Sequence, residues 1–205
     1  MFRRFALLAA VVAALTGTPS FATAGVPTDQ LRARIDQVLD TLGKPELKAR
    51  PETRRATVRS IVGEIFDWDE SARRSLGRHW APRTPAERQE FVRLFADLVE
   101  RSWISKIDLY DRQHVLYLGD TVEGDEGVVR SKVVTKAGSE VALDYRLRRH
   151  ADEQWKVFDL QIAGASLVSN YRAQFDKIIT SESYPALVQR MRAKATENPA
   201  TTPAR

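Results

Sequence analysis

An unbroken alternation of apolar with small or charged side chains runs through Val141-Ala142-Leu143-Asp144-Tyr145-Arg146-Leu147-Arg148. Alternate side chains of a β-strand lie on the same face, which predicts an apolar face made of Val141, Leu143, Tyr145 and Leu147. The same period extends from about 113 to 163, interrupted by turn signals at Gly124-Asp125, Ala137-Gly138 and Ala151-Asp152. The sequence therefore predicts four consecutive strands, with connections short enough for an antiparallel sheet.

The last of these strands is apolar at nearly every position, with Trp155, Val157, Phe158, Leu160 and Ile162. A strand that is apolar on both faces is normally buried on both. We therefore expect it to be central in the sheet or covered by helices.

Helical patterns occupy the chain on both sides of the predicted sheet. Before it, apolar side chains recur at intervals of three and four residues within 28–43, 58–66 and 91–103. Thr84-Pro85-Ala86-Glu87 predicts a helix start with a capping box, and Asp67 with Glu70 predicts a second one. After the sheet, Ser166 is expected to cap a helix, and a last helix is expected over about 185–194. Helices segregated on an antiparallel sheet are typical of an α+β domain. We expect the helices to pack on a twisted sheet of four or slightly more strands and to enclose an apolar cavity.

The first 24 residues have the three parts of a secretory signal. Arg3 and Arg4 precede a short apolar core, and Ala22-Thr23-Ala24 offers a cleavage site. The alternative, a membrane anchor, would need a longer apolar segment to cross about 30 Å of hydrocarbon. We therefore expect residues 1–24 to be a signal peptide, 25–195 to form one domain, and the Pro/Thr/Ala-rich segment 196–205 to be disordered.

The composition narrows the functional classes. The chain has no cysteine, which rules out disulfides, thiolate metal sites and cysteine nucleophiles. Its net charge is +5, but acidic residues are interleaved throughout, so we expect pairs such as Arg73-Arg74 to lie on solvated faces and not on nucleic acid. A positive surface that meets anionic lipid or an acidic partner is the second interpretation.

The sequence contains no convincing catalytic or metal-binding pattern. His79, His114 and His150 lack the clustered spacing of metal ligands. Ser166 lies in a segment that begins like a nucleophile elbow but lacks its closing glycine, so a helix cap is favoured. Asp144 and Asp159 are expected to pair with nearby arginines. We therefore expect a binding protein without cofactor or metal, and not an enzyme.

Several spaced segments resemble a known family, and they occur in the same order as in that family. They are Phe66-Asp67-Trp68 with Leu76-Gly77 and Trp80, Trp155-Lys156-Val157-Phe158-Asp159-Leu160, Gly164-Ala165-Ser166-Leu167-Val168, and Asn170-Tyr171-Arg172 with Gln174-Phe175. Over about 30–191 they are similar to the MlaC/Ttg2-type toluene-tolerance family of periplasmic phospholipid-binding proteins. Ala165 departs from the larger apolar residue that the family pattern leads us to expect.

The resemblance implies a periplasmic carrier that holds phospholipid acyl chains in an apolar cavity and supports outer-membrane lipid asymmetry. Its partners would be an inner-membrane ABC transporter with MCE domains and an outer-membrane lipoprotein–porin complex. Independently of the resemblance, we expect the protein to be a monomer. Some relatives are linked to hopanoid systems, so a hopanoid or another lipid is the alternative cargo.

Bulky apolar side chains on the predicted faces are the candidates for lining the cavity, with ordinary core packing as the alternative for each. They are Ile61, Ile65, Phe66, Trp68, Phe91, Phe95, Leu98, Trp103, Leu116, Val133, Val141, Leu143, Tyr145, Phe158, Leu160, Ile162, Tyr171 and Phe175. Arg172 is expected either to hold its helix to a carboxylate such as Asp159 or Asp67, or to bind a lipid phosphate.

Two other functional classes compete with the carrier. A small α+β pocket enzyme of the nuclear-transport-factor-like kind would need titratable groups, such as Asp144 or Asp159 with a tyrosine, to converge inside the cavity. An adaptor protein would have a solid core and no cavity. The shape and chemistry of the interior therefore separate the three classes.

Overall fold

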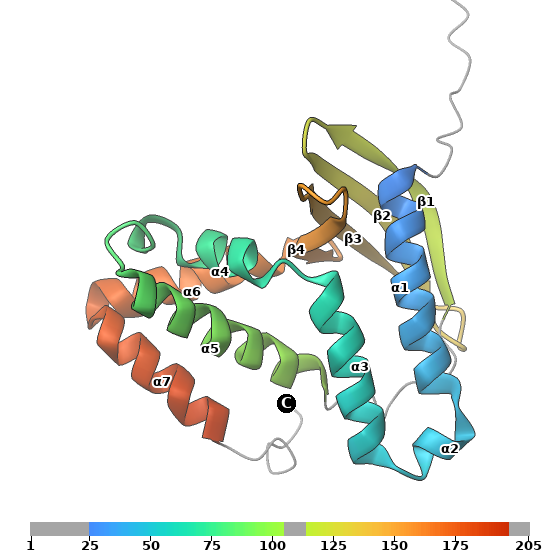
Figure 1. Cartoon of the computed structure of the whole chain (residues 1–205), viewed down its shortest axis with the longest axis horizontal. Coiled ribbons are helices and arrows are strands. Elements are labelled where there is room, and N and C mark those ends of the chain that lie inside the picture. Colours follow the sequence, from blue (N-terminus) through green and yellow to red (C-terminus); the bar gives the residue numbers. More distant parts are fainter. Residues whose placement is uncertain (1–24, 105–113, 197–205) are drawn as a thin grey trace, which may run out of the picture.

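The structure is a computed structural model that describes residues 25–104 and 114–196. The predicted signal peptide (1–24) lies outside the described residues, and so does the predicted tail (196–205) except for Thr196, which is the last residue of a helix and not part of a tail. The described part has helices, then a sheet, then helices, as Figure 1 shows. The predicted α+β class is therefore confirmed.

The alternating segment forms an antiparallel sheet in the order β1-β2-β3-β4-β5. Its strands are β1 (His114–Glu123), β2 (Glu126–Val134), β3 (Glu140–Arg149), β4 (Trp155–Ile162) and the two-residue β5 (Ala165–Ser166). Val129 lies opposite Tyr145, and Gly127 lies opposite Leu147. The predicted four-stranded meander and its apolar face are confirmed, and β5 adds a short edge beside β4.

Helices precede and follow this sheet. The first group is α1 (Val26–Gly43), α2 (Pro45–Lys48), α3 (Pro51–Ile65), α4 (Trp68–Leu76), the short 3-10 helix η1 (Gly77–His79) and α5 (Pro85–Ile104). After β5 come α6 (Leu167–Ser181) and α7 (Tyr184–Thr196). Figure 1 shows α1 and α3 together beside the sheet, and α4 to α7 grouped beyond the junction of α3 and α4.

The helix starts follow the predicted capping chemistry. Thr84 and Glu87 form a complete capping box, in which the Thr84 N–H donates to the Glu87 carboxylate (2.7 Å) and the Glu87 N–H donates to the Thr84 hydroxyl (3.3 Å). Ser166 accepts from the Ser169 N–H at 3.0 Å, and so caps α6. Asp67 accepts from the Glu70 N–H at 2.9 Å, but the Glu70 side chain turns to arginines and does not complete a box.

Apolar side chains form two main cores. The sheet core lies between the sheet and the helices α1 and α3, and its buried members are Leu31, Ile65, Val129, Tyr145, Leu147 and Val157. The helical core lies among α4 to α7, and its buried members are Ala72, Leu76, Phe91, Phe95, Val99, Phe175, Tyr184, Leu187, Val188 and Met191. Edge-on aromatic contacts such as Phe91 with Phe175 (5.6 Å between centroids) fix the helical core.

Strand β4 is covered on both faces, as its composition predicts. Val157 joins the sheet core on one face. On the other face, Phe158 lies beneath Arg74 of α4, whose guanidinium carbon is 3.9 Å from the ring centroid. The strand lies next to the edge of the sheet. Its apolar character is therefore explained by the helices that cover it, since it has no central place in the sheet.

A matched pair of leucines in the sheet tests this division between core and surface. Leu147 is 0% exposed, and Leu118 on β1 is 54% exposed. We expect Leu147→Ala to lower the free energy of unfolding by about 2–5 kcal/mol, because it removes buried contacts and leaves a cavity. The control Leu118→Ala should change it by less than about 1 kcal/mol. Urea titration measures both, and equal losses would contradict the assignment of faces.

Candidate functional site

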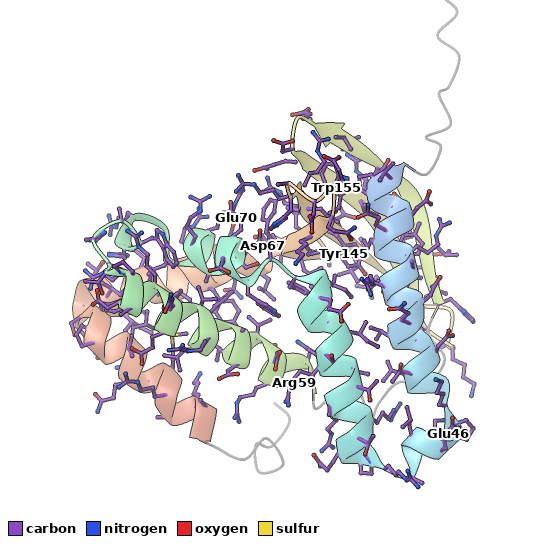
Figure 2. The ribbon with its side chains drawn as sticks, viewed as in Figure 1. Glu46, Arg59, Asp67, Glu70, Tyr145 and Trp155 are labelled. Atoms are coloured by element: carbon purple, nitrogen blue, oxygen red, sulfur yellow. The ribbon has the colours of Figure 1, made fainter. Side chains whose placement is uncertain are left out.

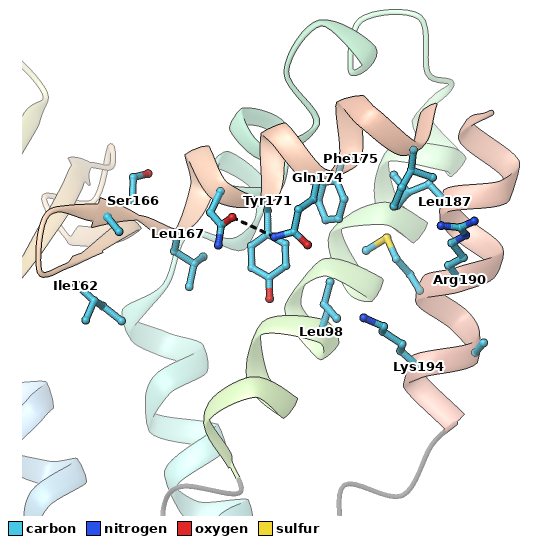
Figure 3. A pocket seen from close by; sticks show the side chains of 15 residues that line it. Leu98, Ile162, Ser166, Leu167, Tyr171, Gln174, Phe175, Leu187, Arg190 and Lys194 are labelled. Atoms are coloured by element: carbon cyan, nitrogen blue, oxygen red, sulfur yellow. Dashed lines mark hydrogen bonds between the residues drawn. The ribbon is translucent and has the colours of Figure 1, made fainter. Parts of the chain in front are cut away.

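A pocket of about 650 Å³ lies between α5, α6, α7 and the end of β4 (Figure 3). Its volume is in the usual range for small-molecule sites, about 300–1,000 Å³. The larger apolar side chains that line it are Leu98, Ile162, Leu167, Tyr171, Phe175, Ile178, Leu187 and Met191. The larger polar ones are Asn170, Gln174, Arg190 and Lys194.

Helical periodicity explains why these side chains meet. On α6, positions 167, 170, 171, 174, 175 and 178 line the pocket, and on α7 positions 187, 190, 191 and 194 do so. Residues three and four apart share one face of a helix, so each helix turns a single face to the pocket. Leu98 of α5 lies between those two faces in Figure 3.

The apolar lining changes from buried to exposed across the pocket. Phe175, Leu187 and Met191 are buried members of the helical core. Leu98 and Tyr171 are half-buried, and Ile162 at the end of β4 is 49% exposed. Side chains of this kind lose contact with water only when something else covers them, so the pocket is the candidate site for an apolar ligand.

Ile162 joins the pocket to the apolar face of the sheet. It lies opposite Leu143 in the β3–β4 register, and Leu160 is two residues earlier on the same strand, so the three side chains share one face. Leu143 and Leu160 are half-buried and pack on the sheet core. The apolar surface of the pocket therefore continues along the sheet.

Four of the residues predicted to line a cavity do line this pocket: Leu98, Ile162, Tyr171 and Phe175. They come from α5, β4 and α6, so the structure brings together side chains that are more than sixty residues apart in the chain. The prediction that they bind lipid stays a prediction.

The other predicted lining residues lie elsewhere. Phe91 and Phe95 are fully buried in the helical core, and Trp68 and Trp103 pack against that core. Ile65 and Tyr145 are buried in the sheet core, and Ile61, Phe66, Leu143 and Leu160 pack against it. Phe158 is buried beneath Arg74, Val133 is half-buried on β2, and Leu116 and Val141 are exposed.

Sequence reasoning missed the contribution of α7. Leu187, Arg190, Met191 and Lys194 all line the pocket, and none of them was among the predicted residues. Their spacing of three and four residues predicts a shared face. It does not say what that face covers, because the partner elements α5 and α6 come from other parts of the chain.

Arg172 lies on the opposite side of α6 from the pocket. Its Nε–H donates to the Arg74 carbonyl at 2.7 Å, close to the end of α4. With Leu76, Arg78 and Asp176 it lines a separate surface hollow. Its partner is therefore a main-chain oxygen and not Asp159 or Asp67, and its position does not suit a lipid phosphate that emerges from the larger pocket.

Asp144 and Asp159, the carboxylates that the alternative enzyme function would need, do not line the pocket. Asp159 is buried and accepts from the Ser166 hydroxyl (2.6 Å) and the Val168 N–H (3.0 Å). The prediction that Asp159 pairs with an arginine is therefore wrong, because the start of α6 supplies its donors. Asp144 does not line the pocket, and no Asp or Glu of the described residues does.

The three histidines lie apart, and two of them contact different carboxylates in the described parts of the chain. His79 contacts Asp176 and His150 contacts Asp67, each at 2.8 Å, and His114 is exposed at the start of β1. Across residues 25–104 and 114–196, no group of three or more histidine or acidic side chains could hold a metal ion. Within the same ranges, no helix is long and apolar enough to span a membrane.

The strongest electrostatic cluster lies on α4, outside the pocket. Glu70 is buried and pairs with Arg73 and Arg74 (both 2.6 Å) and with Arg148 of β3 (3.5 Å). The hydrogen bond from Arg73, helped by Arg74 and opposed by burial, lowers the pKa of Glu70 to about 2. Through Arg148, the cluster ties α4 to strand β3 of the sheet; Figure 2 shows Glu70 on α4.

Comparison with known proteins gives a consistent result. Residues 32–193 match the family model described as MlaC protein. The chain is 20% identical over 199 residues to the intermembrane phospholipid transport system binding protein MlaC of Haemophilus influenzae, covering 94% of this chain and 93% of that protein. It is also similar to a solved phospholipid-binding protein from Ralstonia solanacearum in complex with a phospholipid, with a TM-score of 0.73 and 27% identity over 82% of this chain and 95% of that one.

The Glu70 cluster predicts an acid dependence of stability. The pKa of Glu70 is lower in the folded chain than its ordinary value of 4.5, so its stabilising contribution is complete above that value and is lost as the pH falls toward about 2. We expect Glu70→Gln to be less stable than the native chain at neutral pH, and the difference to shrink in acid. The exposed Glu46→Gln on α2 is the control. Urea unfolding at several pH values measures this, and a difference independent of pH would contradict it.

Proposed function

The chain belongs to the MlaC family, and on that premise we propose that it is a carrier of phospholipid. The acyl chains would lie in the pocket between α5, α6, α7 and β4. The relatives that support this proposal are named for phospholipid binding or transport, and one of them was solved with a phospholipid bound.

The observation that carries the proposal is a pocket lined mainly by bulky apolar side chains and by no carboxylate of the described residues. Each methylene exposed to water costs about 0.8 kcal/mol, so two acyl chains with roughly thirty methylenes cost on the order of 20 kcal/mol. A carrier between two membranes must offset most of this cost with apolar surface. The pocket and its continuation along Ile162, Leu160 and Leu143 supply such a surface.

The chemistry of the pocket favours a carrier over an enzyme. Its ionisable groups are Tyr171, Arg190 and Lys194. Burial raises the pKa of the Tyr171 hydroxyl, so this group stays neutral near neutral pH and is a poor base. Acid–base catalysis would need a titratable pair with pKa values close to the working pH, and the lining does not provide one.

Membership of the family supports a proposal for the wider setting of the carrier. We infer that residues 1–24 are removed as a signal peptide and that the domain that begins at residue 25 acts as a monomer in the periplasm. It would exchange lipid with an outer-membrane lipoprotein–porin complex and with an inner-membrane ABC transporter that carries MCE domains. Such exchange would maintain the lipid asymmetry of the outer membrane.

A charge placed in the pocket tests the proposal. Ile162 lines the pocket yet is 49% exposed, so Ile162→Asp should fold while it repels acyl chains. We expect phospholipid that co-purifies with the native protein to fall roughly tenfold or more, since the loss of one apolar contact costs at least about 1.5 kcal/mol. Native mass spectrometry measures the bound lipid.

The control for that experiment is Leu118→Asp, an equally drastic change at an exposed position of β1 that does not line the pocket. It should keep its lipid. Equal loss from both variants, or native protein that carries no lipid when purified from its own cells, would rule out carriage in this pocket.

A further inference from the structure

The charged side chains that line the pocket are all basic. Arg190 and Lys194, both on α7, line the pocket, and no acidic side chain of the described residues does. Arg190 is already engaged, because it pairs with Glu182 at 2.6 Å. No ion pair of Lys194 occurs within residues 25–104 and 114–196, so its charge is not neutralised there.

Lys194 lies at the end of an apolar stripe. Leu187, Met191 and Lys194 share the face of α7 that lines the pocket. At 1.5 Å per residue, Leu187 and Lys194 are about 10 Å apart along the helix axis. Leu187 and Met191 are buried, whereas Arg190 and Lys194 are exposed, so the part of α7 that lines the pocket becomes more polar from its buried to its solvent-exposed side chains. Figure 3 shows the amino group of Lys194 directed toward Leu98 and the hollow.

This gradient matches the shape of an amphiphile whose polar group is an anion. The buried end suits acyl chains, and a lysine at the exposed end suits a phosphate, for which its ammonium acts as a compact point charge. Arg172 cannot take this role, since it lies on the opposite side of α6 and binds the Arg74 carbonyl. Arg190 is less available because Glu182 already balances it.

We propose that Lys194 binds the headgroup phosphate of the lipid, and that it makes the carrier select phospholipids over lipids without a phosphate, such as hopanoids or diacylglycerol. This inference rests on the proposed carrier function and narrows its cargo. The structural alternative is that Lys194 only stabilises α7, because a cation in the last turn of a helix interacts favourably with the helix dipole.

The test is a competition between two lipids that differ only in the phosphate-bearing headgroup. Delipidated protein is incubated with vesicles that contain equal amounts of phosphatidylglycerol and diacylglycerol with identical acyl chains, and native mass spectrometry gives the ratio of bound species. We expect Lys194→Gln to lower the ratio of phosphatidylglycerol to diacylglycerol about five- to tenfold, as expected for loss of one charge-assisted hydrogen bond. Lys194→Arg should keep the ratio of the native chain.

The matched control is Lys177→Gln, an exposed lysine on α6 that does not line the pocket. Its ratio should be that of the native chain. An unchanged ratio in Lys194→Gln, or an equal loss of both lipids, would overturn the role of Lys194. In either case, lipid binding by the native chain would still support the carrier function. If the native chain takes up neither lipid, the carrier proposal itself fails, and the inference fails with it.

Discussion

The hydrogen bond from the Asp67 N–H to the Val157 carbonyl is 2.9 Å long. It joins the start of the helical group α4 to α7 to strand β4 of the sheet. The side chain of Asp67 caps α4 through the Glu70 N–H and contacts His150 in the β3–β4 turn, so three segments meet at one residue. Phe66, on one side of it, packs on the sheet core, and Trp68, on the other side, packs on the helical core. Their rings stack at 4.7 Å. The contacts of Phe66, Asp67 and Trp68 therefore fix how the helices α4 to α7 are oriented relative to the sheet.

That junction explains why the pocket exists. α4 to α7 bury their apolar faces against each other, and the sheet buries its apolar face against α1 and α3. Each core is complete in itself, so side chains at the boundary, such as Leu98, Tyr171 and Ile162, are covered on one side only. A single merged core would have covered them fully and left no room for a ligand. The hollow therefore lies beside the helical core, next to the end of the sheet.

The sequence predicted local features better than it predicted the site. Alternation gave the strands, and Thr84, Asp67 and Ser166 gave helix starts, because these signals act over a few residues. Phe91, Phe95 and Leu98 lie on one apolar stripe of α5, yet the first two are fully buried and only Leu98 reaches the pocket. Periodicity identifies the buried face of a helix, but the neighbour that each residue meets depends on the tertiary arrangement. For the same reason the role of α7 was not foreseen.

A carrier must release its lipid as well as hold it, and this limits how completely the pocket should cover acyl chains. Burial of about thirty methylenes is worth on the order of 20 kcal/mol relative to water, which is close to the ceiling of non-covalent affinity. The lipid leaves a bilayer, however, where its chains already lie in hydrocarbon, so the pocket needs only to approach that environment. A pocket bounded on one side by the half-exposed Ile162 leaves part of the apolar surface open. Incomplete cover keeps the free energies of bound and membrane lipid close, and transfer in either direction then depends on the partners.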